Sequence, residues 1–189
     1  MEKFIEVYDN FLDSSIENEL ENLALGPLPW KYVKNIALEN SHTHSPGHNC
    51  TFLDKLNPQR IDPNNLLFSY FLLNPLYYLA SKASIVVKDI ITARSFMHLP
   101  SPNPGPDIIH VDTPSPHWVG LYYVNDSDGD TILFEDDKIT ELKRVTPKKG
   151  RMVFFDGSIN HCSSRPANNT RVVLNYDFLG YRIGNKEKN

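Results

Sequence analysis

The sequence has only two cysteines, Cys50 and Cys162, so no cysteine pattern indicates a scaffold held by disulfides. It also lacks an apolar run long enough to span a membrane, because the longest such stretch, 66–80, is interrupted by polar residues and a proline. Residues 1–15 show neither the apolar run nor the small-residue cleavage site of a signal peptide. We therefore expect a cytoplasmic protein with no membrane partner.

An excess of basic residues is missing as well. The formal net charge is −4 and the pI is about 5.9. Nucleic-acid-binding proteins usually show a basic balance or a basic stripe, so we expect no nucleic-acid partner. The composition, 40% hydrophobic and 22% charged, is typical of an ordinary globular protein. A chain of 189 residues fits one domain and can remove roughly 70% of its extended surface from water on folding.

Two segments in the first half of the sequence have helical patterns. In 14–25 the apolar residues recur near one face, a capping residue precedes them and a Gly-Pro pair follows. The segment 64–83 is predicted to form a helix in two pieces, because Pro75 disfavours helical geometry at the residue before it. Residues 40–50 have no periodicity and are predicted to form a loop.

After residue 84 the pattern changes to short runs of β-branched and aromatic residues, separated by Pro, Gly, Asn and Asp. These runs are SIVVKDIITARSF, IIHVDT, HWVGLYYVN, TILFED, ELKRVT, RMVFFDG and TRVVLNYDFLG. Many short strands with such turn signals are typical of a sandwich, a jelly roll or a small barrel. We predict one mainly-β domain over 1–189, in which a helical support, 1–84, flanks a jelly-roll barrel of about eight strands, 85–182. The helices are expected to cover the outer face of the larger sheet.

The run IIHVDT carries two residues with metal-binding side chains. Side chains alternate between the faces of a strand, so His110 and Asp112 should point the same way. His161 follows another apolar strand and is the obvious third ligand. Two histidines and one carboxylate on one side of a metal, with the other positions open, are typical of non-haem Fe(II) oxygenases.

Two further residues extend this pattern. Arg171 begins the last strand and shares a face with Val173 and Asn175, whereas the alternate residues of that strand form an apolar packing face. A guanidinium at this place can grip a carboxylate with two parallel hydrogen bonds. The sequence DGDT is predicted to turn a hairpin and to present Thr131, whose hydroxyl either binds the same carboxylate or stabilises the turn.

Together, HVD, YYVNDSDGDTILFED, VTPKKGRMVFFDGSINH and Arg171 resemble the prolyl-4-hydroxylase-like branch of the 2-oxoglutarate/Fe(II)-dependent oxygenases, with the compact bacteriophage-type members as the nearest likeness. The resemblance covers roughly residues 90–180 and implies a double-stranded β-helix. Here Asp128 and Leu133 replace the first glycine and the phenylalanine of the family's G-G-x-T-x-F hairpin. The tyrosine that many prolyl hydroxylases place ahead of H-x-D is also absent. The motif therefore does not identify proline as the substrate.

The resemblance implies a set of roles. His110, Asp112 and His161 would hold Fe(II), and Arg171 would bind the C5 carboxylate of 2-oxoglutarate with the help of Thr131. Such an enzyme is a dioxygenase that converts 2-oxoglutarate and O2 to succinate and CO2 while it hydroxylates a small-molecule or peptidyl substrate. Related halogenases have a small residue in place of the carboxylate ligand, so Asp112 favours hydroxylation. A phage-encoded member would act in the host cytoplasm.

Two alternatives stay open at this stage. A cupin-like metal dioxygenase or isomerase that does not use 2-oxoglutarate would leave Arg171 without a role. A non-catalytic binding module on the same fold is disfavoured, because a degenerate site should have lost at least one member of the set. Six further residues could line the cleft, although Trp118 and Tyr122 are better explained as core: Arg94, Ser95, His98, His117, Trp118 and Tyr122.

The segment from His42 to Cys50 offers a second metal hypothesis. His42, His44, His48 and Cys50 are residue types that bind zinc, but their spacing fits no common zinc finger and no partner pair of cysteines exists. We favour a loop at the surface or at the edge of the active site.

Overall fold

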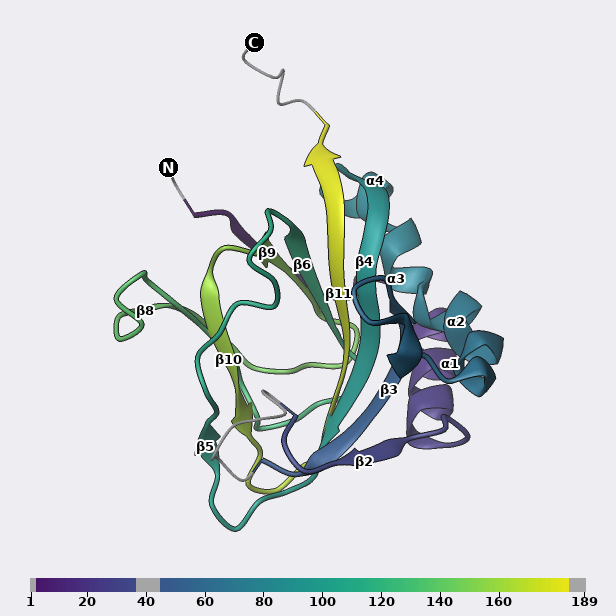
Figure 1. Ribbon diagram of the computed structural model, residues 1–189, viewed down its shortest axis with the longest axis horizontal. Coiled ribbons are helices and arrows are strands. Elements are labelled where there is room, and N and C mark those ends of the chain that lie inside the picture. The colour runs from purple at the N-terminus through teal and green to yellow at the C-terminus, as the bar shows by residue number, and fades with distance from the viewer. Residues whose placement is uncertain (1–2, 37–44, 184–189) are drawn as a thin grey trace.

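In the computed structural model, which describes residues 3–36 and 45–183, two antiparallel sheets face each other and helices cover one of them (Figure 1). The strands are β1 (Ile5–Tyr8), β2 (Lys31–Val33), β3 (Gly47–Asp54), β4 (Ile85–His98), β5 (Gly105–Pro106), β6 (Trp118–Tyr123), β7 (Thr131–Phe134), β8 (Glu141–Val145), β9 (Met152–Asp156), β10 (Asn160–Arg165) and β11 (Arg171–Arg182). The larger sheet has the order β1-β9-β6-β11-β4-β3-β2, and the smaller has the order β5-β10-β7-β8. The prediction of a mainly-β fold is confirmed.

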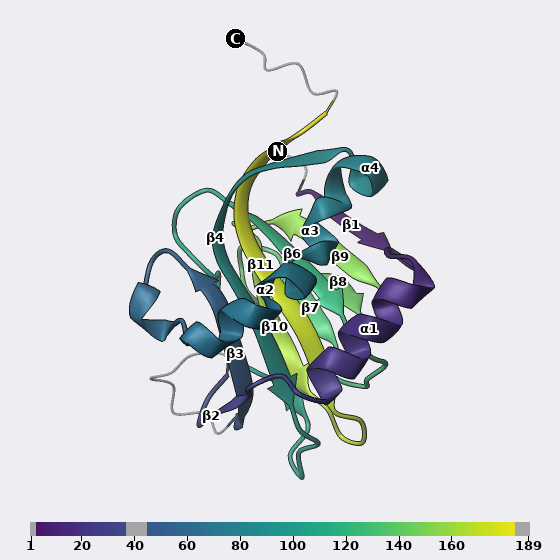
Figure 2. The ribbon, with the colours of Figure 1, turned by 90° about the vertical axis from the view of Figure 1, so that its right-hand side faces the viewer.

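The helices are α1 (Ser14–Leu25), α2 (Leu66–Leu72), α3 (Asn74–Tyr77) and α4 (Leu79–Ala83), with 3-10 turns at Pro58–Arg60 and Pro63–Asn65. They lie on the outer face of the larger sheet, as predicted (Figure 2). The segment 64–83 forms three helices, and Pro75 lies in the first turn of α3, where its missing N–H costs no helical hydrogen bond. None of the described helices has the length and apolar character needed to cross a membrane.

The central strand β11 separates the core under the helices from the pocket between the sheets. It pairs with β4 on one side and β6 on the other, and its residues alternate between two environments. Val172, Leu174, Tyr176 and Phe178 are buried in the cluster under the helices. Arg171, Val173 and Asn175 face the other way and line a pocket between the sheets. Both faces of this strand were predicted correctly from its period of two.

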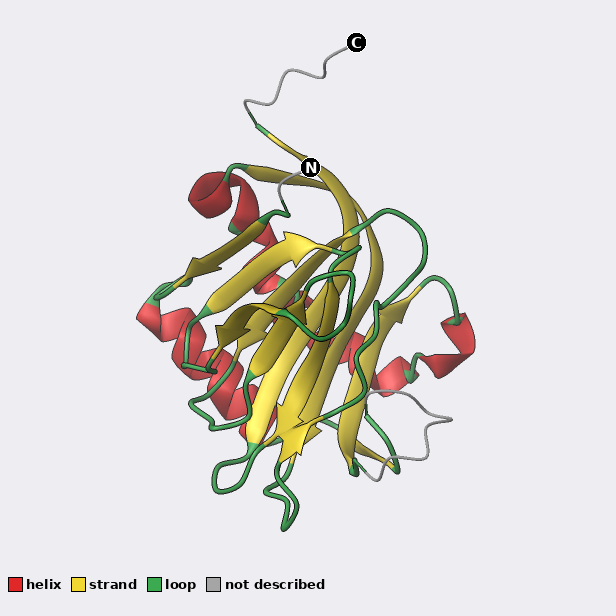
Figure 3. Cartoon of the chain, turned by 90° about the vertical axis from the view of Figure 1, so that its left-hand side faces the viewer, coloured by secondary structure: helices red, strands yellow, loops and turns green. Residues whose placement is uncertain are grey.

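Three expectations about the strands need correction. Residues 47–50, expected to be loop, begin β3, and the segment 1–84 contributes three strands to the larger sheet besides its helices. The turn DGDT does not close a hairpin, because β6 and β7 belong to different sheets. Figure 3 draws the strands of both sheets in yellow and the helices in red. The run IIHVDT forms no strand; only His110 pairs, in an isolated bridge. Within 85–182 the structure has eight strands, β4 to β11, which agrees with the eight or so expected for the barrel.

The aromatic ring of Phe154 offers a test of the core beneath the helices. This ring is fully buried and stacks on Trp118 and Phe178, with centroids 5.0 and 5.6 Å away. Phe154→Ala should lower the free energy of unfolding by about 3–5 kcal/mol, because it leaves a cavity that its neighbours fill only partly. Urea denaturation measures the change. Ile139→Ala, at a residue 81% exposed, is the control and should stay within about 0.5 kcal/mol of the parent.

Candidate active site

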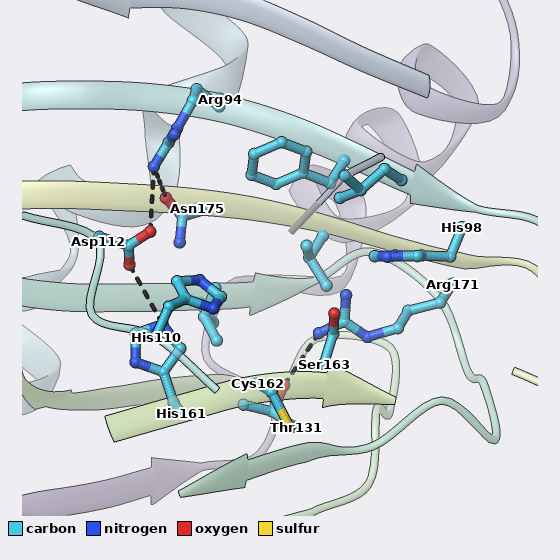
Figure 4. Close-up of a pocket in the computed structure, with 14 residues that line it drawn as sticks. Arg94, His98, His110, Asp112, Thr131, His161, Cys162, Ser163, Arg171 and Asn175 are labelled. Atoms are coloured by element: carbon cyan, nitrogen blue, oxygen red, sulfur yellow. Dashed lines mark hydrogen bonds and ion pairs between the residues drawn. The ribbon is translucent and has the colours of Figure 1, made fainter. Parts of the chain in front are cut away.

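His110, Asp112 and His161 lie together in the pocket between the sheets (Figure 4). One ligand atom from each lies within 4.8 Å of the other two. The backbones of the two histidines are joined by a pair of hydrogen bonds of 2.9 Å, from each N–H to the carbonyl of the other. His161 is on β10, near its start, whereas His110 and Asp112 lie in the segment between β5 and β6. This short bridge therefore aligns a loop with a strand.

Both histidines are held in the same way. The Nδ1 of His110 bonds the carbonyl of Ile108 and the Nδ1 of His161 bonds the carbonyl of Ile159, each at 2.9 Å. A histidine whose Nδ1–H donates to a carbonyl has its Nε2 lone pair free, which is the form that binds a metal. Burial lowers the pKa of His110, and the neighbouring His161 lowers it further, so the ring favours its neutral form.

The carboxylate of Asp112 completes the donor set. Its Oδ2 lies 3.3 Å from the Nε2 of His161 and, although buried, accepts no hydrogen bond from the described residues. Burial would raise the pKa of Asp112, but the adjacent His161 and the charge of Arg94 hold it well below its ordinary value. An ionised oxygen left without a donor beside two imidazole nitrogens fits a divalent cation such as Fe(II).

Arg171 lies in the same pocket, on the side away from Asp112 (Figure 4). Its side chain is buried, and its Nη2 donates to Thr131 Oγ1 at 2.9 Å. The Nε is buried with no hydrogen-bond partner, and in the described part of the chain no carboxylate lies within 4.0 Å of the guanidinium nitrogens. Burial lowers the pKa of Arg171. A buried cation without a carboxylate partner is costly, so this position favours the binding of an anion.

Tyr123 contacts two residues of the pocket, and sequence reasoning missed it. Its hydroxyl donates to Thr131 Oγ1 at 2.7 Å, and its ring centroid lies 5.8 Å from the Arg171 guanidinium. It shares a face of β6 with Leu121, which lines the pocket. The alternation of side chains along HWVGLYYVN places Tyr122 and Tyr123 on opposite faces of the strand, but it does not show which of the two faces the site. The pairing of Tyr123 with Val173 in the sheet decides it.

The other residues considered for the cleft divide between site and core. Arg94 and His98 line the pocket. Both ring nitrogens of His98 are buried and form no hydrogen bond with the described residues, and the Nε2 lies 3.7 Å from a carboxylate oxygen of Asp107. Burial lowers the pKa of this histidine below its ordinary value. Tyr122 and Trp118, by contrast, belong to the cluster under the helices, as expected for core residues.

Of the last two residues, His117 lies beside the pocket, whereas Ser95 is on the face of β4 toward the core under the helices, paired with Leu174 and Cys50. Ser95 is buried and donates a hydrogen bond to the backbone carbonyl of Val173. His117 is buried near Asp112 and Asp177, and a Cβ added to Gly157 would lie 2.3 Å from its Nε2. Only glycine leaves room for the imidazole at that place.

The zinc hypothesis for the segment from His42 to Cys50 falls partly outside the described residues, because His42 and His44 lie there. The rest of it lies in β3, where Cys50 is buried in the core under the helices. Burial raises the pKa of Cys50 to about 12, which disfavours the thiolate that zinc requires.

Comparisons with known proteins agree on the fold. No protein-family model matches the sequence, and no curated protein matches it. Among solved structures, a 2OG-Fe(II) oxygenase family oxidoreductase from Burkholderia pseudomallei aligns with a TM-score of 0.66 at 12% identity, covering 93% of this chain and 84% of that one. A prolyl-4-hydroxylase from Pseudomonas putida aligns at 0.57 with 16% identity, covering 93% and 92%.

A third solved structure is an enzyme of a different reaction type. The non-heme alpha-ketoglutarate-dependent carbocyclase SnoK of nogalamycin biosynthesis aligns with a TM-score of 0.63 at 12% identity, covering 99% of this chain and 85% of that one. Likeness at such low identity shows the fold alone, which is the predicted double-stranded β-helix. The chemistry has to be argued from the pocket.

The two thiols provide a test of the burial on which this account relies. Cys50 and Cys162 are both fully buried, and burial raises their pKa values to about 12 and about 11. We expect neither thiol to react with iodoacetamide at pH 8 in the native protein, and both to react in 6 M guanidinium, as counted by mass spectrometry. Rapid alkylation of either thiol in the native protein would contradict the packing described for it.

Proposed function

We propose that this protein is a non-haem Fe(II)- and 2-oxoglutarate-dependent dioxygenase that oxidises, most simply hydroxylates, a small-molecule or peptidyl substrate. The observation that carries the proposal is the buried guanidinium of Arg171, without a carboxylate partner among the described residues, in the pocket that also holds two histidines and a carboxylate. A metal donor set and a separate anion site in one pocket suit a cosubstrate that chelates the metal at one end and carries a carboxylate at the other.

In the proposed mechanism the protein supplies binding and orientation. His110, Asp112 and His161 would hold Fe(II), which when bound would supply the chemistry that converts 2-oxoglutarate and O2 to succinate and CO2 as the substrate is oxidised. Arg171 binds the distal carboxylate of 2-oxoglutarate through its guanidinium nitrogens, and the hydroxyl of Thr131 is close enough to assist.

Four apolar residues limit the water around the cosubstrate. Besides the metal donors and Arg171, the pocket is lined by Ile36, Phe96, Leu121 and Val173. Exclusion of water strengthens the electrostatic grip of Arg171 on the distal carboxylate, because the local dielectric constant is lower. The Tyr123 hydroxyl, bonded to Thr131, fixes the direction of the Thr131 side chain.

The alternatives account for less of the pocket. A cupin-like metal dioxygenase or isomerase without 2-oxoglutarate gives no reason to bury an arginine beside the metal donors, where an unpaired charge is costly. A non-catalytic binding module gives no reason to keep all three donors in register. The presence of Asp112 favours hydroxylation over halogenation.

The cosubstrate assignment predicts the effect of removing Arg171. Arg171→Met leaves the distal carboxylate unpaired in a buried pocket, which costs on the order of 3–5 kcal/mol. The dissociation constant of 2-oxoglutarate, measured by anaerobic calorimetry with Fe(II) present, should therefore rise at least about a hundredfold. The affinity for Fe(II) itself should stay close to that of the parent, because Arg171 contacts none of the three donors.

Arg144→Met is the matched control, because Arg144 makes exposed ion pairs with Glu141 and Asp130 outside the pocket. It should leave the affinity for 2-oxoglutarate unchanged. A loss of less than threefold in Arg171→Met would show that another residue holds the distal carboxylate.

A further inference from the structure

Asp112 differs from the two histidines in how it is supported. His161 lies in β10 and His110 is joined to it by backbone hydrogen bonds, whereas Asp112 lies in a bend outside every strand. A ligand on a loop points in a fixed direction only if other groups hold its side chain. Among the described residues its carboxylate has two ion-pairing neighbours within 4.0 Å: Arg94 Nη2, 3.3 Å from Oδ1, and His161 Nε2, 3.3 Å from Oδ2. His117 and Asp177 each have a possible ligand atom within 4.8 Å of it.

Arg94 is itself fixed to the centre of the larger sheet. It lies on β4 directly opposite Asn175 of β11, and its Nη2 donates to Asn175 Oδ1 at 3.2 Å and to Asp177 Oδ2 at 3.0 Å. Thr92, the cross-strand partner of Asp177, donates a hydrogen bond to the same carboxylate. Figure 4 shows the Arg94 guanidinium reaching from its strand toward Asp112 and Asn175. A side chain fixed to the centre of the larger sheet thus contacts Asp112, the ligand with the least backbone support.

The two carboxylate oxygens of Asp112 have different surroundings. Oδ1 faces the guanidinium, while Oδ2 faces the histidines and accepts no hydrogen bond among the described residues. A carboxylate held at one oxygen offers only the other to a metal. If it turned to bind through both, it would occupy a position that the cosubstrate or O2 requires.

We propose that Arg94 is a positioning residue that holds Asp112 as a ligand through one oxygen, and this inference rests on the function proposed above. Arg94 acts on the site through its ion pair with Asp112, and Asn175 and Asp177 orient its guanidinium. The competing explanation is that Arg94 only neutralises Asp177 within the sheet. The two explanations differ in what happens to metal binding when Arg94 is replaced.

The test uses Co(II) as a spectroscopic substitute for Fe(II), in the full-length protein. Arg94→Met removes the guanidinium but leaves Asp177 as an unpaired buried charge, which destabilises the fold. The double variant Arg94→Met/Asp177→Asn removes both charges and still frees Asp112. Arg94→Lys keeps the charge on a shorter side chain, so its ammonium does not take the place of Nη2, the one nitrogen that contacts Asp112, Asn175 and Asp177. Arg144→Met is the control outside the pocket.

Each variant is titrated with Co(II), following the visible d–d bands, and its fold is checked by circular dichroism. We expect the Co(II) dissociation constant to rise at least about tenfold in Arg94→Met and in the double variant, with altered bands, as is usual when a group that orients a metal ligand is lost. Arg94→Lys should fall between these variants and the parent, and Arg144→Met should match the parent.

Two contrary results have different meanings. If the parent binds Co(II), and Arg94→Met and the double variant bind it within threefold with unchanged bands, Arg94 does not position Asp112 and the inference is wrong while the proposed function stands. If the parent itself binds no Co(II), the metal centre is wrong and the proposed function fails with it.

Discussion

The pair of backbone hydrogen bonds between His110 and His161 is the contact on which the candidate site depends. It is the one β-bridge in the described part of the segment between β5 and β6, and it joins this segment to β10, to which the Asp107 N–H also donates at the Ser163 carbonyl. The bridge sets the distance between the backbones of His110 and His161. Both imidazoles then bond a carbonyl two residues earlier, so the same local backbone geometry sets both rings.

The central strand β11 contributes both to the core that stabilises the molecule and to the pocket. One of its faces packs under the helices, and the other supplies Arg171, Val173 and Asn175 to the pocket. A long strand paired on both sides moves little, so the anion site and the orienting group of Arg94 keep their positions relative to each other. The packing that stabilises the fold therefore also sets the spacing between the metal donors and Arg171.

The sequence allowed prediction of what depends on local periodicity. The two faces of β11 and the helices over the larger sheet follow from the spacing of apolar residues. Contacts between distant segments were predicted only where the chemistry of the residues suggested a shared site, as for His110, Asp112 and His161. The contact of Tyr123 with Thr131 and that of Arg94 with Asp112 depend on the pairing of distant strands, which leaves no local pattern. The DGDT turn was misread because turn residues mark a reversal of the chain without showing which sheet the next strand joins.

The central claim is that one pocket binds Fe(II) and 2-oxoglutarate together. Anaerobic titration of the metal-free protein with Fe(II) and then 2-oxoglutarate, followed by visible absorption, tests it most directly, because chelation of the metal by the cosubstrate gives a weak charge-transfer band. The account predicts that the band appears in the parent and is lost in His110→Ala. If Fe(II) binds but 2-oxoglutarate produces no band, the cosubstrate assignment is contradicted, and the cupin-like alternative becomes the better explanation of the pocket.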